Sequence, residues 1–254
     1  GFVFADIPPA SHPRSPRPRP LPRAGAMTES MAVDDGDDGL GQGSIAAGTM
    51  RQTPLFGGAM SMLLPDGFVD VATLRQVPDT QECWANAATD QSVSVEILAH
   101  DDDVGDEHAA KFYLEDIAEC NDASEHSSSP TPSENLSHTL SALFGTVPGS
   151  VGGGAPNLGP PSCWGTSGVQ HVSKFKESDR NAVLIHLAVI RLPCVDSDVV
   201  VHLNQPLAIN PESSSSTVAR ATPTGSSEQG AALFRAILAS LAVHDWDLFG
   251  TVEG

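Results

Sequence analysis

Two long apolar stretches in the second half of the chain constrain the fold more than any other feature. Residues 182–193 (AVLIHLAVIRLP) form a continuous, partly β-branched apolar run, and residues 196–207 (DSDVVVHLNQPL) form a second one. A run of this kind is typical of a strand that is covered on both faces. Because only a short CVDSD connection separates the two runs, we predict a central strand and an antiparallel neighbour joined as a hairpin.

Shorter strands are expected earlier in the chain. Residues 60–64 are an apolar run that leads into a Pro-Asp-Gly sequence, which is typical of a strand followed by a tight turn. Residues 92–98 (SVSVEIL) alternate between valine or isoleucine and other residues, so we predict a strand with one face buried.

Two segments have the apolar spacing of an amphipathic helix. Residues 106–119 and 228–243 each place apolar side chains at positions i, i+3, i+4 and i+7. These side chains are Ala110, Tyr113, Leu114 and Ile117 in the first segment, and Phe234, Ile237, Leu238 and Leu241 in the second. The order strand, strand, helix, strand, strand, helix predicts an antiparallel sheet with helices packed on it, in an α+β or three-layer domain.

Composition divides the chain into a leader and one domain. Residues 1–54 are rich in proline and arginine and then in acid and glycine, so we expect a disordered leader. Residues 55–254 are expected to form a single domain. Serine, proline and glycine dominate residues 122–168, which we expect to be a disordered low-complexity insert with room for a short helix over 136–144.

The first 26 residues fit two descriptions. They contain four arginines and little acid, as organelle transit peptides do. They also fit a sequence translated upstream of a start at Met27 or Met31, which is the interpretation we favour.

The formal net charge of −19 limits the partners that the chain can bind. Such a charge repels nucleic-acid phosphates and anionic membranes and attracts a basic protein surface, although it also serves solubility alone. The sequence has no apolar run of the roughly 18–20 residues that a membrane span needs. We therefore expect a soluble monomer that binds a basic protein and neither nucleic acid nor membrane.

The sequence lacks the motifs of the common catalytic chemistries. It has no P-loop, no H-E-x-x-H, no G-x-S-x-G and no EF-hand loop. The cysteines are widely spaced without a C-x-x-C pair, which predicts reduced thiols. They are Cys83, Cys120, Cys163 and Cys194. We predict a protein that is not an enzyme and has no catalytic residues, no cofactor and no metal.

Histidines leave one enzymatic alternative open. His186 and His202 lie in the two central apolar runs and would form a catalytic or metal-binding pair if they were neighbours, although core histidines are the more frequent case. The sequence HDDD at residues 100–103 has the composition of a cation site and also that of a solvated loop.

A proline-initiated acidic segment, VPDTQE at residues 77–82, places Asp79 and Glu82 three residues apart. In a helical turn, both carboxylates would face one side and suit an arginine or lysine of another protein. At a helix N-terminus, the same acids would stabilise the helix dipole without any partner. The residues alone do not decide between these two interpretations.

Several stretches, taken in order, resemble the Ran guanine nucleotide release factor family, the Mog-type proteins. They lie within residues 55–121 and 169–250, and are LFGGA, LPDGFVDVATLRQVPDTQE, DQSVSVEIL, FYLEDIAE, AVIRLP with DSDVVVHLNQPL, and HDWDLFG. The resemblance implies a three-layer α/β/α sandwich with a mostly antiparallel central sheet, the fold shared with PsbP, an extrinsic subunit of photosystem II.

The resemblance also implies a function and a site. Proteins of this family bind the GTPase Ran and promote release of its guanine nucleotide in nucleocytoplasmic transport, which places them in the nucleus and cytoplasm. The acidic Ran-binding pair carries over to Asp79 and Glu82, with Asp70, Arg75 and Gln81 as neighbours in the matched stretch. Because the fold is shared, a PsbP-like lumenal protein of photosynthetic membranes is the alternative.

Overall fold

A computed structural model of the chain describes residues 49–123, 129–148, 159–173, 180–208 and 226–250. Residues 1–48 of the expected leader (1–54), residues 124–128 and 149–158 of the expected insert, and most of the linker between the last strand of the hairpin and the final helix lie outside the described residues.

The predicted central hairpin is confirmed. Strand β8 (Arg180–Leu192) and strand β9 (Ser197–Ala208) pair antiparallel, and the short 3₁₀ turn η5 (Pro193–Val195) joins them. Both strands are buried on their two faces, as a continuous apolar run requires.

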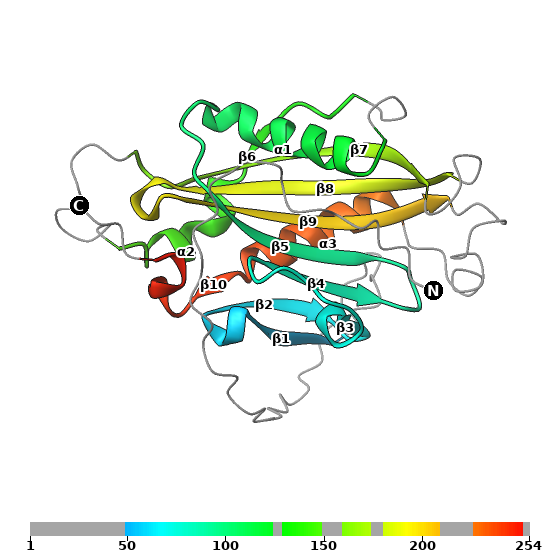
Figure 1. The fold of residues 1–254 in the computed structure, drawn as a ribbon, viewed down its shortest axis with the longest axis horizontal. Coiled ribbons are helices and arrows are strands. Elements are labelled where there is room, and N and C mark those ends of the chain that lie inside the picture. The colour runs from blue at the N-terminus through cyan, green and yellow to red at the C-terminus, as the bar shows by residue number, and fades with distance from the viewer. Residues whose placement is uncertain (1–48, 124–128, 149–158, 174–179, 209–225, 251–254) are drawn as a thin grey trace, which may run out of the picture.

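The hairpin lies inside a seven-stranded sheet with the order β3-β4-β5-β9-β8-β7-β6 (Figure 1). Every strand pairing among the described residues is antiparallel. The other strands of this sheet are β3 (Phe68–Asp70), β4 (Gln81–Asn86), β5 (Ser92–Ala99), β6 (Glu134–Asn135) and β7 (Ser162–Ser173).

A second, three-stranded sheet brings the two ends of the described chain together. Its strands are β1 (Met50–Leu55), β2 (Met60–Pro65) and β10 (Ala242–Val243), with β2 in the middle. The predicted strand and tight turn over residues 60–67 are confirmed. Ordered structure begins before the expected residue 55, because β1 pairs with β2 from Met50 onward.

Both predicted helices are present, but the second one ends four residues earlier than predicted. Helix α1 (Asp106–Cys120) buries the predicted apolar side chains. Helix α3 (Ser227–Ala239) stops before residue 243. The hydroxyl of Ser240 donates to the carbonyl of Ile237 (2.7 Å) and accepts from the amide of Leu63 (2.8 Å), so the chain leaves the helix there and joins β2.

The segment expected to be a low-complexity insert contains ordered elements. Besides β6 and the first half of β7 it holds the 3₁₀ turn η4 (Ser137–Leu140) and the short helix α2 (Ser141–Phe144), which matches the helix expected over 136–144. Glycine in this segment marks close packing, because a Cβ on Gly165 would lie 2.5 Å from Leu136. Composition therefore gave the wrong boundary here.

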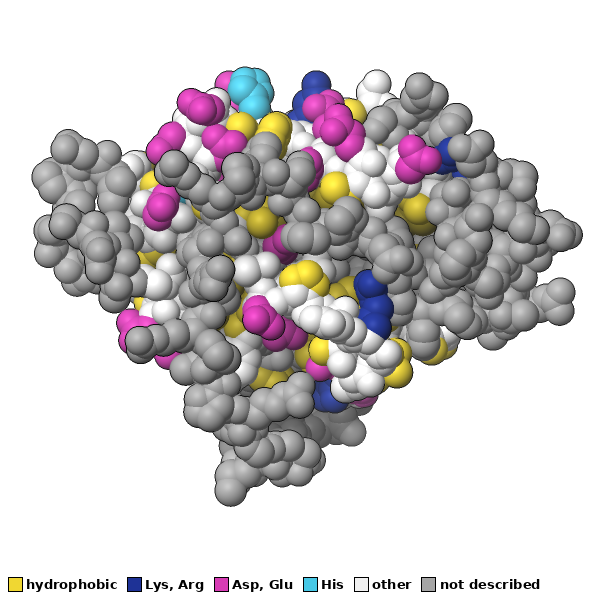
Figure 2. Space-filling view, viewed as in Figure 1, with side chains coloured by type: hydrophobic (Ala, Val, Ile, Leu, Met, Phe, Trp, Pro, Cys, Tyr) yellow, Lys and Arg dark blue, Asp and Glu magenta, His cyan; other side chains and the backbone are white. Residues whose placement is uncertain are grey.

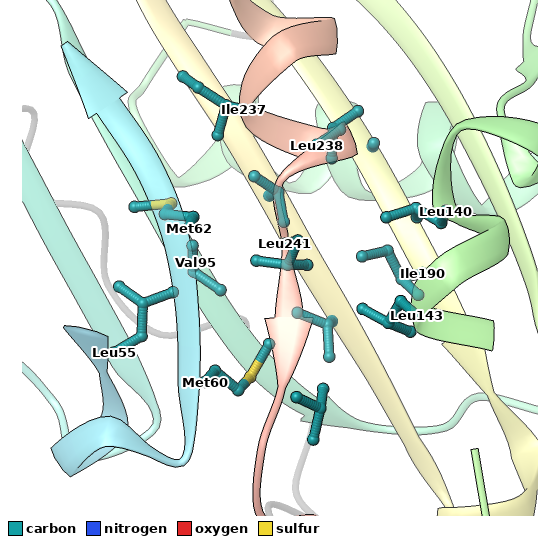
Figure 3. Close-up of a cluster of buried hydrophobic side chains, with 14 of the residues drawn as sticks. Leu55, Met60, Met62, Val95, Leu140, Leu143, Ile190, Ile237, Leu238 and Leu241 are labelled. Carbon is teal, nitrogen blue, oxygen red and sulfur yellow. The ribbon is translucent and has the colours of Figure 1, made fainter. Parts of the chain in front are cut away.

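Helices cover both faces of the large sheet, so the fold is α+β in three layers (Figure 1). Helix α1 packs on one face, over β7 and β8. Helix α3 and the small sheet pack on the other face, where side chains from α3, the small sheet and the large sheet form the larger hydrophobic cluster (Figure 3). Strand β5 is buried on both faces rather than one, since Ser94 and Glu96 are also inaccessible.

Candidate functional site

The acidic segment forms a β-turn followed by a strand. The amide of Gln81 donates to the carbonyl of Pro78 (3.0 Å), which closes a turn with Asp79 at its exposed tip. The carbonyl of Thr80 accepts from the amide of Ile97 (2.9 Å), so β5 holds the far side of the turn. The segment is neither a helical turn nor a helix N-terminus, and both sequence interpretations of its backbone were wrong.

Glu82 occupies a different environment from Asp79. It is half-buried in β4, on the sheet face that carries its pairing partner Val95 and meets the small sheet. Its Oε1 accepts a hydrogen bond from the backbone amide of Phe56 at 2.7 Å. The carboxylate therefore links the edge of the large sheet to the small one.

The bond from Glu82 holds a loop with an uncommon backbone. Phe56, Gly57 and Gly58 form the turn η1 between β1 and β2, and all three have positive φ angles of 49°, 68° and 97°. A positive φ is rare for a bulky residue such as phenylalanine and costs about 1–2 kcal/mol. The Phe56 side chain is buried, whereas the two glycines are exposed.

The remaining predicted site residues have structural contacts. Asp70 accepts from the amide of Ala72 (2.7 Å) and so caps the 3₁₀ turn η2 (Val71–Thr73). Gln81 is buried on the α1 side of the sheet, opposite to Glu82, and Arg75 is half-buried.

The Cys83 thiol reports which of these charges lie near one another. Burial raises its pKa, while the hydrogen bond with Ser94 and the charge of Arg75 lower it. The charges of Asp70 and Glu82 raise it further. Three of the five predicted residues therefore lie within electrostatic range of this thiol.

Two features of this region were not predicted from the sequence. The η1 loop was missed as part of the site, although its Gly-Gly pair signals a backbone that other residues adopt with difficulty. Val69 and Leu74, which are 48% and 61% exposed, are large apolar side chains in the same segment as the acidic turn. Exposed apolar side chains beside charged ones are typical of protein-binding surfaces.

Acid is not confined to the turn. Figure 2 shows acidic side chains gathered over α1, at the top of the view. The acidic residues of this helix are Asp106, Glu107, Glu115, Asp116 and Glu119. A charge change on α1 can therefore serve as a control for the same charge change at Asp79.

The HDDD sequence leads into the protein interior. The imidazole Nδ1 of His100 lies 2.7 Å from Oδ1 of Asp198, which is fully buried, and Arg191 Nε lies 3.3 Å from the same oxygen. Tyr113 donates to the other carboxylate oxygen at 3.2 Å. The expectation of a solvated loop was therefore wrong for His100, which belongs to a buried charge network.

The two central histidines are not a pair. His186 lies opposite Leu203 on the α3 side of the sheet, and His202 lies opposite Leu187 on the α1 side. Across the ranges that the structure describes, no three His, Cys, Asp or Glu side chains gather as a metal-binding group. No helix in those ranges is long and apolar enough to cross a membrane.

A polar groove of about 600 Å³ lies between α1 and residues 129–133. Its walls include Lys111, Glu115 and Gln170, and its lining has no histidine or cysteine. The other polar side chains of the lining are serine, threonine and glutamate.

Comparison with known sequences points to one family. The family model described as "Ran-interacting Mog1 protein" matches residues 53–206. The Ran guanine nucleotide release factor of Danio rerio is 34% identical over 204 residues, which cover 78% of this chain and 98% of the relative. The protein of the same name from Homo sapiens is 33% identical and covers 79% of this chain and 97% of the relative.

A solved structure has the same fold. The Saccharomyces cerevisiae Ran-binding protein Mog1p superposes with a TM-score of 0.53 and 25% identity, and the match covers 80% of this chain and all of that one. A cyanobacterial PsbP from Synechocystis has a TM-score of 0.41 and 12% identity.

Proposed function

The chain belongs to the Ran-interacting Mog1 protein family, and we propose on this premise that it binds the GTPase Ran and promotes release of its guanine nucleotide. The observation that carries the proposal is the family match over residues 53–206, which spans the acidic turn and both central strands. The family relationship favours this function over the PsbP-like alternative. A relative from Saccharomyces cerevisiae is named a nuclear import protein, which supports a role in nucleocytoplasmic transport, in the nucleus and cytoplasm.

The proposed docking surface has the acidic turn at its centre. Asp79 is exposed on a turn whose backbone is hydrogen-bonded at both ends, so the backbone that carries its carboxylate has little freedom to lose on binding. A carboxylate in this setting suits an arginine or lysine of Ran. The exposed side chains of Val69 and Leu74 supply apolar contact area in the same segment.

Docking alone accounts for nucleotide release. If this chain binds more tightly to a conformation of Ran that holds nucleotide weakly, linkage requires that nucleotide binds more weakly to the complex. We propose that the protein acts as a monomer in this way, without catalytic residues, a cofactor or a metal of its own.

The test is the release of fluorescent GDP and GTP from purified Ran with and without this protein. Faster release of at least one nucleotide is expected, and unchanged release of both, together with no binding, contradicts the proposed function. Asp79→Lys is expected to weaken Ran binding by roughly tenfold or more, because it replaces attraction by repulsion.

The matched control is Glu119→Lys, which makes the same charge change on an exposed position of α1. Equal losses in both variants would show that only the total charge matters and that the acidic turn is not the docking site.

A further inference from the structure

Asp79 and Glu82 are both acidic, but their surroundings differ. Asp79 is exposed at the tip of a turn, whereas Glu82 is half-buried and bonded through Oε1 to the amide of Phe56 at 2.7 Å. We propose that Glu82 is a positioning residue, which holds the η1 loop so that the exposed backbone of Gly57 and Gly58 forms a second part of the Ran-docking surface. This inference rests on the proposed function, and it separates a residue that acts by charge from one that acts through the loop.

The loop needs an acceptor at this position. Phe56 has a left-handed backbone, with φ 49°, and the residue is only 8% exposed within the hydrophobic cluster. Its amide therefore points to Glu82 from a conformation that the residue would not adopt by preference. A carboxylate is the strongest common acceptor for a backbone amide, so Glu82 stabilises the conformation of the whole turn.

The other end of the loop is also fixed. The carbonyl of Ala59 accepts from the amides of His244 (2.8 Å) and Asp245 (3.1 Å), which follow strand β10. Gly57 and Gly58 lie between these two attachments. A loop fastened on both sides presents its backbone to a partner in one arrangement, which lowers the entropy lost on binding.

The glycines leave the outer surface of the loop bare. A Cβ built on Gly58 meets no atom within 4 Å, so no internal contact requires a glycine at this position. Its φ of 97° does favour glycine, and the absent side chain lets another backbone approach closely. The open space above the loop therefore fits a segment of a protein partner that pairs with exposed backbone groups.

Three substitutions distinguish a positioning role from a charge role. Glu82→Gln keeps the acceptor oxygen and removes the charge, Glu82→Ala removes both, and Asp79→Asn removes only the charge at the turn. We expect Ran binding to weaken by roughly tenfold in Glu82→Ala and Asp79→Asn, and to stay within about threefold of wild type in Glu82→Gln. The salt dependence of Ran association is expected to decrease in Asp79→Asn and to persist in Glu82→Gln.

A measurement on this protein alone tests the positioning role of Glu82 separately from the proposed binding of Ran. Hydrogen exchange of the Phe56 amide is expected to be slow in wild type and Glu82→Gln and faster in Glu82→Ala. If Glu82→Gln binds Ran as weakly as Glu82→Ala while its Phe56 amide stays protected, the charge is what matters and the positioning role is overturned. If wild type itself does not bind Ran, the proposed function fails whatever the amide shows.

A change in the loop itself provides the second line of test. Gly58→Ala keeps Glu82 but adds a Cβ at a φ of 97°, which strains the loop backbone and occupies the space above it, so it is expected to weaken Ran binding by roughly fivefold or more. This variant also keeps the inference testable if Glu82→Ala folds poorly. Wild-type affinity in a folded Gly58→Ala protein would remove the loop from the docking surface.

Discussion

The two faces of the seven-stranded sheet are held to their covering layers by different contacts. On one face, Ile237 and Leu238 of α3 are fully buried in a cluster made mostly of hydrocarbon (Figure 3). On the other face, the hydrophobic cluster beneath α1 is smaller, and the buried Arg191 and Asp198 lie at its end. Buried apolar surface holds α3 to the sheet, whereas α1 is held by buried apolar surface together with a network of buried charges.

The difference has consequences for how each face responds to change. Hydrocarbon packing loses free energy in proportion to the volume removed, and swaps that keep the volume are tolerated. A buried network depends on every partner, because the loss of one leaves another unsatisfied in a medium of low dielectric constant. Removing side-chain atoms on the α1 face should therefore lower the free energy of unfolding more, per atom removed, than on the α3 face.

The largest effect is expected from Arg191→Ala. The guanidinium lies 3.3 Å from the fully buried carboxylate of Asp198 and donates to the carbonyl of Asp101 (2.7 Å). Removing it leaves a buried carboxylate with fewer partners, which lowers the free energy of unfolding by about 3–5 kcal/mol. Denaturant unfolding measures the loss. The control is Arg235→Ala, which breaks an exposed pair with Glu134 and should cost below about 1 kcal/mol; similar losses in both would contradict the comparison.

On the opposite face, Leu238→Ala is expected to cost about 2–4 kcal/mol, because the side chain is fully buried and α3 cannot close the cavity completely. Leu238→Met, which nearly keeps the volume, should cost less than about 1.5 kcal/mol. The same unfolding measurement applies to both variants. A loss in Leu238→Met as large as that in Leu238→Ala would show that this face also depends on exact geometry.

Gly230→Ala tests a place where α3 touches buried polar groups of the sheet. A Cβ on Gly230 would lie 1.8 Å from Oε1 of Gln205 and 3.1 Å from Nε2 of His186, both of which are buried. We expect a loss of about 1–3 kcal/mol from the forced shift. The exposed Ser227→Ala in the same helix is the control. Adding Gln205→Ala to Gly230→Ala should recover part of the loss if the clash is its cause.

The effect expected from Glu96→Gln differs from the others because it depends on pH and is absent at low pH. Burial, together with the charge of Asp116, raises the pKa of Glu96 from 4.5 to about 7. A carboxyl with a raised pKa contributes stability below pH 4.5, and that contribution is lost as the pH rises through about 7. Glu96→Gln should therefore match wild type at low pH and exceed it by roughly 3 kcal/mol at pH 8, which is the free energy that a rise in pKa from 4.5 to about 7 corresponds to.

The pH series needs the wild-type protein as its reference. Burial lowers the pKa of His202 to about 4, so this histidine removes stability as the pH falls from 6.5 toward 4. His202 is present in both proteins and cancels in the difference between them. A difference that stays constant from pH 4.5 to 8 would show that Glu96 does not titrate in this range.

Periodicity was enough to predict the elements whose side chains face a continuous core. The central hairpin, the strand at residues 60–65 and helix α1 were predicted because apolar spacing reflects burial directly. The end of α3 and the start of β7 were missed. A serine hydroxyl that bonds to β2 ends α3, and β7 contains Gly165 because Leu136 packs against it, so neither position carries an apolar signal.

The candidate site was predicted only in part. Asp79 and Glu82 came from the resemblance to a family, and the spacing of the two acids suggested that they act alike. The bond from Glu82 to the amide of Phe56 joins positions 26 residues apart, one in a strand of the large sheet and the other in the turn between two strands of the small sheet. Local patterns contain no information about such a contact, so the different surroundings of the two acids became visible only in the folded chain.

The pairing of β10 with β2 also sets an order of assembly. Residues 60–61 pair with residues 242–243, which are synthesised much later, so the small sheet is completed only after nearly all of the domain has been synthesised. Until then β2 offers an unpaired edge, which is a site for association with other chains. A nascent or truncated chain that lacks β10 would keep this edge open and leave the carbonyl of Ala59 without the amides of residues 244–245, so the proposed docking loop is among the last parts of the protein to mature.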